Sequence, residues 1–411
     1  MTKKMRKHRS HFVGFCTLML MLAGSEANAD ALRDILSKDK NLLFEYDFRK
    51  NKAQSDKLKK SWINPVMLRY NRDYSEQFGS KTVKTGSFTV SIDQPIFRSG
   101  GIYYAIKYAQ ALRGVNEAQI KLKKREMIAN AVKLLFQIKK TTLEIAKLKL
   151  VIKNDAIDIR LKRESYQAGL LDSSFLDQAL LKKNQDEASL LELQANLAEL
   201  KENFTLLSDK DPNTIKPPKL KLIPKKRYEE KNLELTRDKL KVDQEQYNTK
   251  VTIAKYLPAL SVHARYVDED VNPLFARSAS GLKEKYRTYG LTLSMPLDIN
   301  MFDDVEASKV EALKAETELI ERKKSIEKEY TVIRKKIKII DKKIALAKKN
   351  EKLYFNLYKV TKNLAKAGVK TKYDAQMMYN SLQIKKLDRK IYYYDKQIEL
   401  LVLYAKVNDA I

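Results

Sequence analysis

The residues that could carry chemistry in this chain are few and lie far apart. There is one cysteine, Cys16, and His263 is the one histidine beyond the first eleven residues. No His/Cys/Asp/Glu cluster has metal-ligand spacing, no glycine-rich segment resembles a phosphate loop, and no nucleophile has a base beside it. The run from Tyr392 to Tyr394 is typical of helix packing more than of base stacking. The sequence therefore predicts a protein that is not an enzyme and that binds no cofactor or metal.

The composition favours long helices. The chain has 411 residues, of which 32% are charged and only 11 are glycine and 9 proline. Its formal net charge is +29, and such an excess of positive charge suggests nucleic acid or an anionic membrane as a partner. The lysines are scattered beside Glu and Asp, without a basic block, so we interpret them as solvated helix faces. We therefore expect no nucleic-acid partner.

The N-terminus has the pattern of a secretory signal peptide. A basic segment to Arg9 precedes the short apolar segment 12–23 and the small-x-small site that ends at Ala29. Cys16 lies inside the apolar segment and follows no lipobox, so no lipid anchor is expected. No other run approaches the roughly 18 apolar residues of a membrane-spanning helix. The mature protein is predicted to be exported, to contain no disulfide and to have no membrane-spanning helix.

Two segments 201 residues apart share one pattern. Apolar residues alternate with polar ones in SFTVSIDQPIFRSGG, where Pro95 is predicted to end a strand. The same alternation occurs in TYGLTLSMPLDINMF, which closes at Pro296. Each segment is followed by a very long helical pattern. An internal duplication of a strand and a long helix therefore organises the chain.

Each copy has a second alternating segment, and both follow a proline. WINPVMLRY has its strand after Pro65, and YLPALSVHARYV has its strand after Pro258. We therefore place the strand–helix junctions at four prolines: Pro65, Pro95, Pro258 and Pro296. In the later strand His263 falls on the polar face. Each pair of strands is predicted to form a hairpin.

The long helices carry seven-residue apolar repeats. They are predicted from about Ile102 to Ala168 and from about Asp303 to Ala367. Such strict heptads indicate coiled-coil packing. The repeats are Ala131, Ile138, Ile145, Ile152, Ile159 and Tyr166 in the first helix, and Leu319, Ile326, Ile333, Ile340, Ala347 and Tyr354 in the second.

Both long helices are predicted to end and to be followed in the same way. Gly169 and Gly368 have the positions of left-handed C-terminal caps. The next helix is then opened by a capping box, Ser174 with Asp177 in the first copy and Thr371 with Asp374 in the second. Two αα-hairpins result, each with a sharp tip.

The chain divides into four predicted parts. They are a signal peptide at 1–29, a first repeat at 30–208, a proline-containing linker at 209–227 and a second repeat at 228–411. The repeats are expected to begin with helices at about 31–61 and 228–254. The fold class is mainly α with a small β part. Four strands cannot close a barrel, so a barrel would need more than one chain, and the strands alone leave two or three chains open.

The duplicated pattern resembles that of TolC-like outer-membrane efflux proteins. The resemblance rests on the four strand segments quoted above and on the tip sequences YQAGLLDSSFLDQA and AGVKTKYDAQMMYNSL, in this order. It implies a homotrimer with a shared transmembrane β-barrel, a periplasmic α-barrel of long helices, and an equatorial linker. It also implies that the hairpin tips form the periplasmic entrance and contact an adaptor protein, which connects to an inner-membrane transporter.

The resemblance also implies acidic residues after the second tip. Asp374 fits the first acidic position of the family, Met377 stands at the next one, and Lys370 occupies a place where the family can have arginine. A ring of one Asp per chain would attract cations less strongly than the family's full set. The alternative is that Asp374 only caps its helix.

The function expected from the resemblance is an exit duct for efflux or type I secretion. Two alternatives stay open. One is a periplasmic coiled-coil structural or adhesive protein, in which the four strands would be misread. The other is a porin, which would have many more strands and usually end on one. The exported substrate and the class of pump are not encoded in these patterns.

We predict cleavage after Ala29 without lipid attachment. N-terminal sequencing of the mature protein checks this, and we expect Asp30 as its first residue. A different start, or an acylated cysteine, would contradict the prediction.

Overall fold

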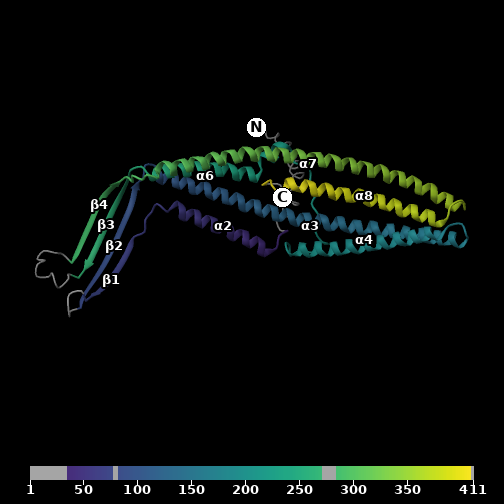
Figure 1. Cartoon of the computed structure of the whole chain (residues 1–411), viewed down its shortest axis with the longest axis horizontal. Helices are drawn as coiled ribbons and strands as arrows, with labels where there is room; N and C mark the ends of the chain where they lie inside the picture. Colours follow the sequence, from purple (N-terminus) through teal and green to yellow (C-terminus); the bar gives the residue numbers. More distant parts are fainter. Residues whose placement is uncertain (1–34, 77–81, 271–283, 409–411) are drawn as a thin grey trace, which may run out of the picture. The chain divides into compact units, whose positions relative to one another are not determined.

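A computed structural model of the chain describes residues 35–76, 82–270 and 284–408 (Figure 1). The signal peptide and its cleavage site at Ala29 lie outside the described residues. The elements, in chain order, are α2 (Lys38–Lys59), β1 (Met67–Ser75), β2 (Val83–Phe97), α3 (Gly101–Gln167), α4 (Ser173–Thr205), α5 (Lys225–Glu230), α6 (Leu233–Lys255), β3 (Ala259–Glu269), β4 (Lys285–Ser294), α7 (Met301–Lys366) and α8 (Lys372–Tyr404).

The chain forms two compact units, which we describe separately. The sheet unit comprises Tyr46–Gln119 and Glu234–Lys323. The hairpin unit comprises Met1–Glu45, Ile120–Leu233 and Lys324–Ile411. The two long helices α3 and α7 contribute residues to both units because their 67 and 66 residues cross the division.

The sheet unit contains one antiparallel sheet in the order β1-β2-β3-β4. The predicted hairpins β1–β2 and β3–β4 are both present, and β2 also pairs with β3. This central pairing joins the first repeat to the second within one sheet. In the described residues β1 and β4 are the edge strands.

The sheet has one apolar and one polar face, as the alternation predicts. Pairs such as Leu68 with Val90 and Val262 with Leu291 lie on one face. Residues between them lie on the other, as Asp93 does opposite His263. The register therefore places most apolar residues of the four strands on one side, whereas Val83 and Val267 are buried on the other.

Two strand boundaries differ from the prediction. β2 extends through Pro95 to Phe97, with an irregular register between these two residues, so Pro95 does not end the strand. Its position at the end of β2 explains why the missing N–H is tolerated. β2 also begins at Val83, four residues before the alternating segment that predicted it, because β1 pairs with it as far as Ser75.

The helix expected at 228–254 is two helices. α5 ends at Glu230 and α6 begins at Leu233, with Asn232 fully buried between them and bridged to Val407. The spacing of apolar residues around Asn232 cannot predict this pairing, because Val407 lies far away in the sequence. The first helix, expected at 31–61, is described as α2 from Lys38 to Lys59.

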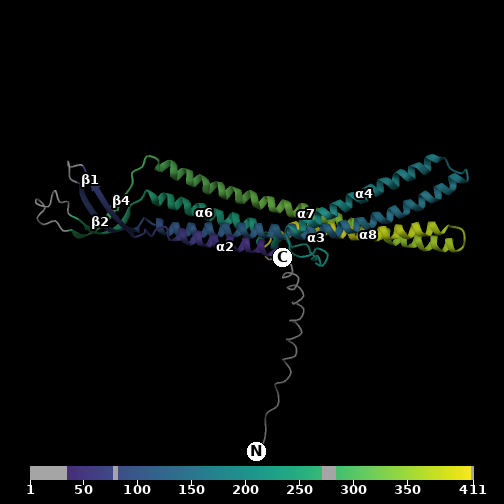
Figure 2. The ribbon, with the colours of Figure 1, turned by 90° about the horizontal axis from the view of Figure 1, so that it is seen from below.

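The hairpin unit consists of two antiparallel helix pairs, α3 with α4 and α7 with α8, each with its own tip (Figure 2). Its core is deepest around α3, where Leu135, Phe136 and Ile138 have at most 1% of their surface exposed. Leu400 and Leu403 of α8 are fully buried. In the described part of the chain no helix has both the length and the apolar character needed to cross a membrane.

Candidate functional site at the hairpin tips

The two tips are built by the same backbone device. Gly169 and Gly368 have φ angles of +70° and +76°, the left-handed region that glycine adopts without strain. At the first tip Leu170 N donates to Ser165 O and Gly169 N to Tyr166 O. The equivalent bonds join Val369 to Leu364 and Gly368 to Ala365. Each long helix therefore ends in a Schellman motif, and its left-handed glycine is the cap that the sequence predicts.

The start of α8 is the predicted capping box. Thr371 Oγ1 accepts from Asp374 N at 3.1 Å, while Asp374 Oδ2 accepts from Thr371 N at 2.9 Å and from Thr371 Oγ1 at 2.8 Å. These hydrogen bonds favour the carboxylate and lower the pKa of Asp374. The charge at this tip is therefore fixed in place by the helix end that it caps.

The start of α4 differs from the prediction. Asp172 is the cap, because its Oδ1 accepts from Ser174 N at 2.8 Å. Ser174 is the second helical residue, so Ser174 and Asp177 do not form the expected capping box. Hydrogen bonds from Ser174 lower the pKa of Asp172. Asp177, the fifth residue of α4, is exposed.

The tips expose apolar side chains beside their charges. Leu170 and Val369, each directly after its glycine, have 77% and 71% of their surface exposed. Lys370 is exposed next to Val369, and its positive charge helps to lower the pKa of Asp374. The tips thus expose apolar side chains close to charged ones, since Phe175 at the first tip is also 47% exposed, and these side chains are available for contact with another protein.

A row of polar contacts connects α3 with α8 at seven-residue intervals. Lys140 Nζ lies 2.8 Å from Asp395 Oδ1, and Lys147 Nζ lies 2.7 Å from Asp388 Oδ1. Seven residues further, Asn154 Nδ2 lies 3.4 Å from Ser381 Oγ. We call this row, with the two contacts described next, the α3–α8 ladder.

The ladder continues toward the tips without ion pairs. Asn380, with only 2% of its surface exposed, donates to Asn154 Oδ1 at 2.9 Å and accepts from Gln376 at 3.0 Å. Nearest the tips the guanidinium of Arg160 lies 4.6 Å from the ring centre of Tyr373. Buried amides without partners are costly, so separating the two hairpins here requires water to replace these bonds.

The contact between α3 and α4 includes a buried carboxylate. Asp155 has 7% of its surface exposed, and Lys182 bonds both to it and, at 3.1 Å, to Asp186. Burial raises the pKa of Asp155, and the ammonium of Lys182 opposes that rise. The first hairpin is thus fastened by a cluster of three charges close to its tip.

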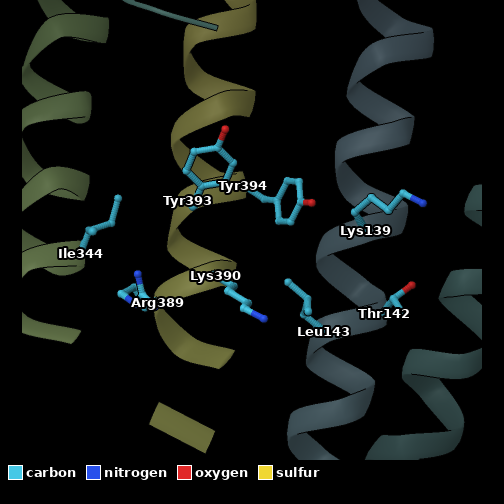
Figure 3. A pocket seen from close by; sticks show the side chains of 8 residues that line it. All are labelled: Lys139, Thr142, Leu143, Ile344, Arg389, Lys390, Tyr393 and Tyr394. Carbon is cyan, nitrogen blue, oxygen red and sulfur yellow. The ribbon is translucent and has the colours of Figure 1, made fainter. Parts of the chain in front are cut away.

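A groove of about 530 Å³ lies along the ladder, between α3, α7 and α8. Figure 3 shows Tyr394 and Lys390 extending from α8 toward α3, where Lys139 and Leu143 line the other side. The ring of Tyr394 lies 6.2 Å from that of Phe136 and 5.6 Å from that of Tyr393. The tyrosine run therefore packs against neighbouring side chains, as expected.

The remaining predicted residues lie in the sheet unit. Pro258 directly precedes β3, while Pro65 stands two residues before β1 and Pro296 two residues after β4. These three prolines therefore mark strand ends. His263 Nδ1 lies 3.2 Å from Thr292 Oγ1, and its ring packs against Gly290. In the described residues no group of three potential metal ligands occurs. His263 is therefore a hydrogen-bonded residue of the polar face.

Sequence reasoning missed the ladder. The signal was available, because Lys140, Lys147 and Asn154 recur every seven residues, two positions after the isoleucines of the first heptad repeat. Its partners on α8, however, follow only from the register of two segments more than 200 residues apart.

Solved structures share this fold over nearly the whole chain. The outer membrane protein VceC of Vibrio cholerae aligns with a TM-score of 0.73 and 12% identity, covering 94% of this chain and 97% of its own. The Campylobacter jejuni CmeC outer membrane channel aligns with a TM-score of 0.72 and 14% identity, covering 93% of this chain and 86% of its own. The Neisseria gonorrhoeae MtrE outer membrane channel aligns with a TM-score of 0.68 and 10% identity, covering 93% of this chain and 89% of its own.

No protein-family model and no curated protein matches the sequence. The structural likeness confirms the predicted fold: long helices and a four-stranded sheet in two repeated halves, as in TolC-like outer-membrane channels.

Replacing Gly368 with Val should misplace the start of α8 without unfolding the protein. No atom lies within 4 Å of a Cβ built there, so the cost comes from the left-handed backbone alone, roughly 1–2 kcal/mol. We expect normal amounts of folded protein by circular dichroism and faster proteolysis at the tip. Gly368→Asn is the matched control, because Asn tolerates this backbone better. A variant that fails to fold would show that the tip is a folding element.

Proposed function

We propose that the protein is an outer-membrane exit duct of a tripartite export system. In this proposal three chains form a tube from the outer membrane into the periplasm. The hairpin tips meet a periplasmic adaptor, which connects the duct to an inner-membrane transporter. The duct is not an enzyme and uses no cofactor. The substrates, whether small molecules, metal ions or proteins, depend on the pump.

The observation that carries the proposal is the two-faced sheet. Its apolar face is open to solvent in the single chain: Leu68 and Tyr70 are 68% and 66% exposed on one edge strand, and Tyr289 and Leu291 are 83% and 68% exposed on the other. A soluble protein would cover such a patch. A sheet with lipid outside and water inside would present these two faces.

The sheet edges support the assembly of several chains. In lipid, the N–H and C=O groups of an edge strand must be paired, because no water is present to satisfy them. Pairing β4 of one chain with β1 of the next would satisfy both edges in every copy. Three copies would give twelve strands, an even number within the range of outer-membrane barrels.

The helices offer a matching contact between copies. α7 has an exposed apolar row at seven-residue spacing, 51–59% exposed, which we call the α7 seam: Val332, Ile339, Leu346, Leu353 and Val360. Lys335, Lys342 and Lys349 border it. α4 has an exposed row of smaller apolar residues, the α4 seam: Leu181, Ala188, Leu191, Ala195 and Ala198.

The charges beside the two seams are complementary. Glu192, Glu199 and Glu202 of α4 are exposed next to its seam, opposite in sign to the lysines beside the α7 seam. Because α3 and α8 already contact each other within one chain, α4 and α7 are the helices left to meet a neighbour. Heptad seams with opposite flanking charges favour such pairing.

The tips and the ladder fit a regulated entrance. The ladder holds the two hairpins of one chain together, and its last two contacts use neutral amides and an exposed cation–π pair. Asp374 adds one negative charge per chain beside Lys370, so an entrance formed by these tips would attract cations only weakly. The proposal assigns adaptor contact to Gly169, Leu170, Gly368, Val369 and Lys370.

Disulfide trapping tests the assembly. Cleavage after Ala29 would remove the single cysteine, so introduced cysteines would be the only ones. Ala195 and Leu346 lie on the two seams at similar distances from their tips. We expect Ala195→Cys with Leu346→Cys to give a covalent trimer in outer-membrane fractions. Ala195→Cys with Ala345→Cys is the control, because Ala345 lies on another face of α7. Equal cross-linking of both pairs, or none, would reject this interface.

Conductance in planar bilayers tests the duct and its entrance. We expect small, rarely open channels from the unmodified protein and a several-fold higher conductance from Asn380→Ala with Arg160→Ala, because the last ladder contacts are gone. Lys314→Ala, which removes an exposed ion pair with Glu311 within α7, is the control. Asp374→Ala should shift ion preference toward anions. Trimers that never conduct, with or without the ladder contacts, would rule out the duct.

A further inference from the structure

The exposed side of α7 carries a continuous stripe of lysine. Between Lys324 and Lys366, thirteen residues recur at alternating spacings of four and three; nine are lysine and none is acidic. All nine lysines are exposed. This spacing keeps them on one side of the helix over 42 residues, about 60 Å. We call this row the lysine stripe.

The lysine stripe lies away from the contacts of α7 within its own chain. Positions on either side of the buried Ile333/Ile337 seam contact α8, through Lys336 with Glu399 and Asp341 with Lys396. The stripe occupies the opposite side. From Lys328 to Lys366, its lysines have no carboxylate within 4 Å in the described part of the chain.

One row of the stripe is also clear of the proposed contact with a second copy. Lys335, Lys342 and Lys349 border the α7 seam, whereas Lys338, Lys352 and Lys359 lie one step further round the helix. Among the described residues these outer lysines therefore have no acidic partner within the chain, and the proposed α4–α7 contact would supply none.

The linker adds positive charge at the N-terminal end of the stripe. Residues 214–227 contain six basic residues and no acidic one. The linker is held on the unit by Leu220 N bonded to Gln397 Oε1 at 2.6 Å and by Tyr330 Oη bonded to Ile223 O at 2.8 Å. Lys225 reaches Glu327, next to Lys328. The basic surface is therefore fixed in position and extends beyond α7.

We propose that the lysine stripe binds an anionic polymer of the periplasm, the peptidoglycan, through the carboxylates of its stem peptides. Lysine is a hydrated point charge on a flexible stem, and it is depleted in protein–protein interfaces, where Arg, Tyr and Trp dominate. The stripe contains no arginine and no aromatic residue. Many unpaired lysines in a row suit a hydrated polyanion, whose charges recur without fixed geometry.

The inference does not rest on export itself, only on exposure of the hairpin unit to the periplasm. An outer-membrane protein that reaches into the periplasm meets the cell wall there. Multiple weak ion pairs would hold the helix against the wall without a defined pocket, and salt would weaken them.

Sedimentation with purified peptidoglycan sacculi tests the proposal, using the full mature protein in detergent. We expect co-sedimentation at low salt, loss at high salt, and loss with sacculi whose carboxylates have been amidated. Lys338→Gln with Lys352→Gln and Lys359→Gln should bind about threefold or more weakly. Lys50→Gln with Lys52→Gln and Lys57→Gln, which removes the same charge from exposed positions on α2, should bind like the unmodified protein.

Three results would overturn the proposal: no binding, equal binding of the two triple variants, or equal binding to amidated sacculi. If the stripe variant kept full sacculus binding but lost cross-linking to an adaptor, the stripe would instead be a protein-docking surface. Trimer amount and conductance, measured on the same samples, separate these outcomes from a failure of the duct itself.

Discussion

The seven-residue spacing of side chains along four helices is the constraint on which the hairpin unit depends. One row of residues at this spacing forms the buried seam of α7, which packs against α8. A second row, Lys140, Lys147 and Asn154, lies on the side of α3 that contacts α8. A third leaves Val332 to Val360 exposed on α7. Because side chains seven apart stay on one side of a helix for many turns, each face can carry its own contact.

Local signals predicted the features that depend on neighbouring residues. Gly169 and Gly368 end their helices as expected because a Schellman motif needs only one left-handed residue. The alternation of Phe88, Val90 and Ile92 sets the face of β2 without reference to its partners. Thr371 and Asp374 form their capping box within a single turn.

The missed features all involve distant partners or near-equivalent local choices. Asp172 caps α4 although Ser174 begins an equally plausible motif two residues later, because the turn after Gly169 brings Asp172 to the first free N–H groups. The break at Asn232 depends on Val407, and the pairing of β2 with β3 joins segments about 170 residues apart. Such choices are decided by packing across the chain.

The distribution of charged residues around α7 differs from their distribution along the sequence. Read linearly, the lysines are scattered among Glu and Asp, and solvated faces are a sufficient explanation. In the structure the two acidic residues of α7 that follow Tyr330, Asp341 and Glu351, pair with Lys396 and Arg389 of α8. The lysine stripe lies on the side of α7 opposite to these ion pairs. The excess positive charge of α7 therefore lies on one side of the helix. The linear sequence does not make this arrangement apparent.

The distribution of burial decides where the hairpin unit can move. Fully buried side chains gather around Phe136, Leu400 and Leu403, where the linker is also bonded to α8. Toward the tips burial declines: Ala347 is the last buried residue of α7, and Ile159 the last of α3. Segments with few buried contacts open at lower free energy than the core does. In a duct of the proposed kind, the hairpins would therefore part at their tips while the region around Phe136 stays packed. The ladder follows the same order, since its ion pairs lie near the core and its amide and cation–π contacts lie near the tips.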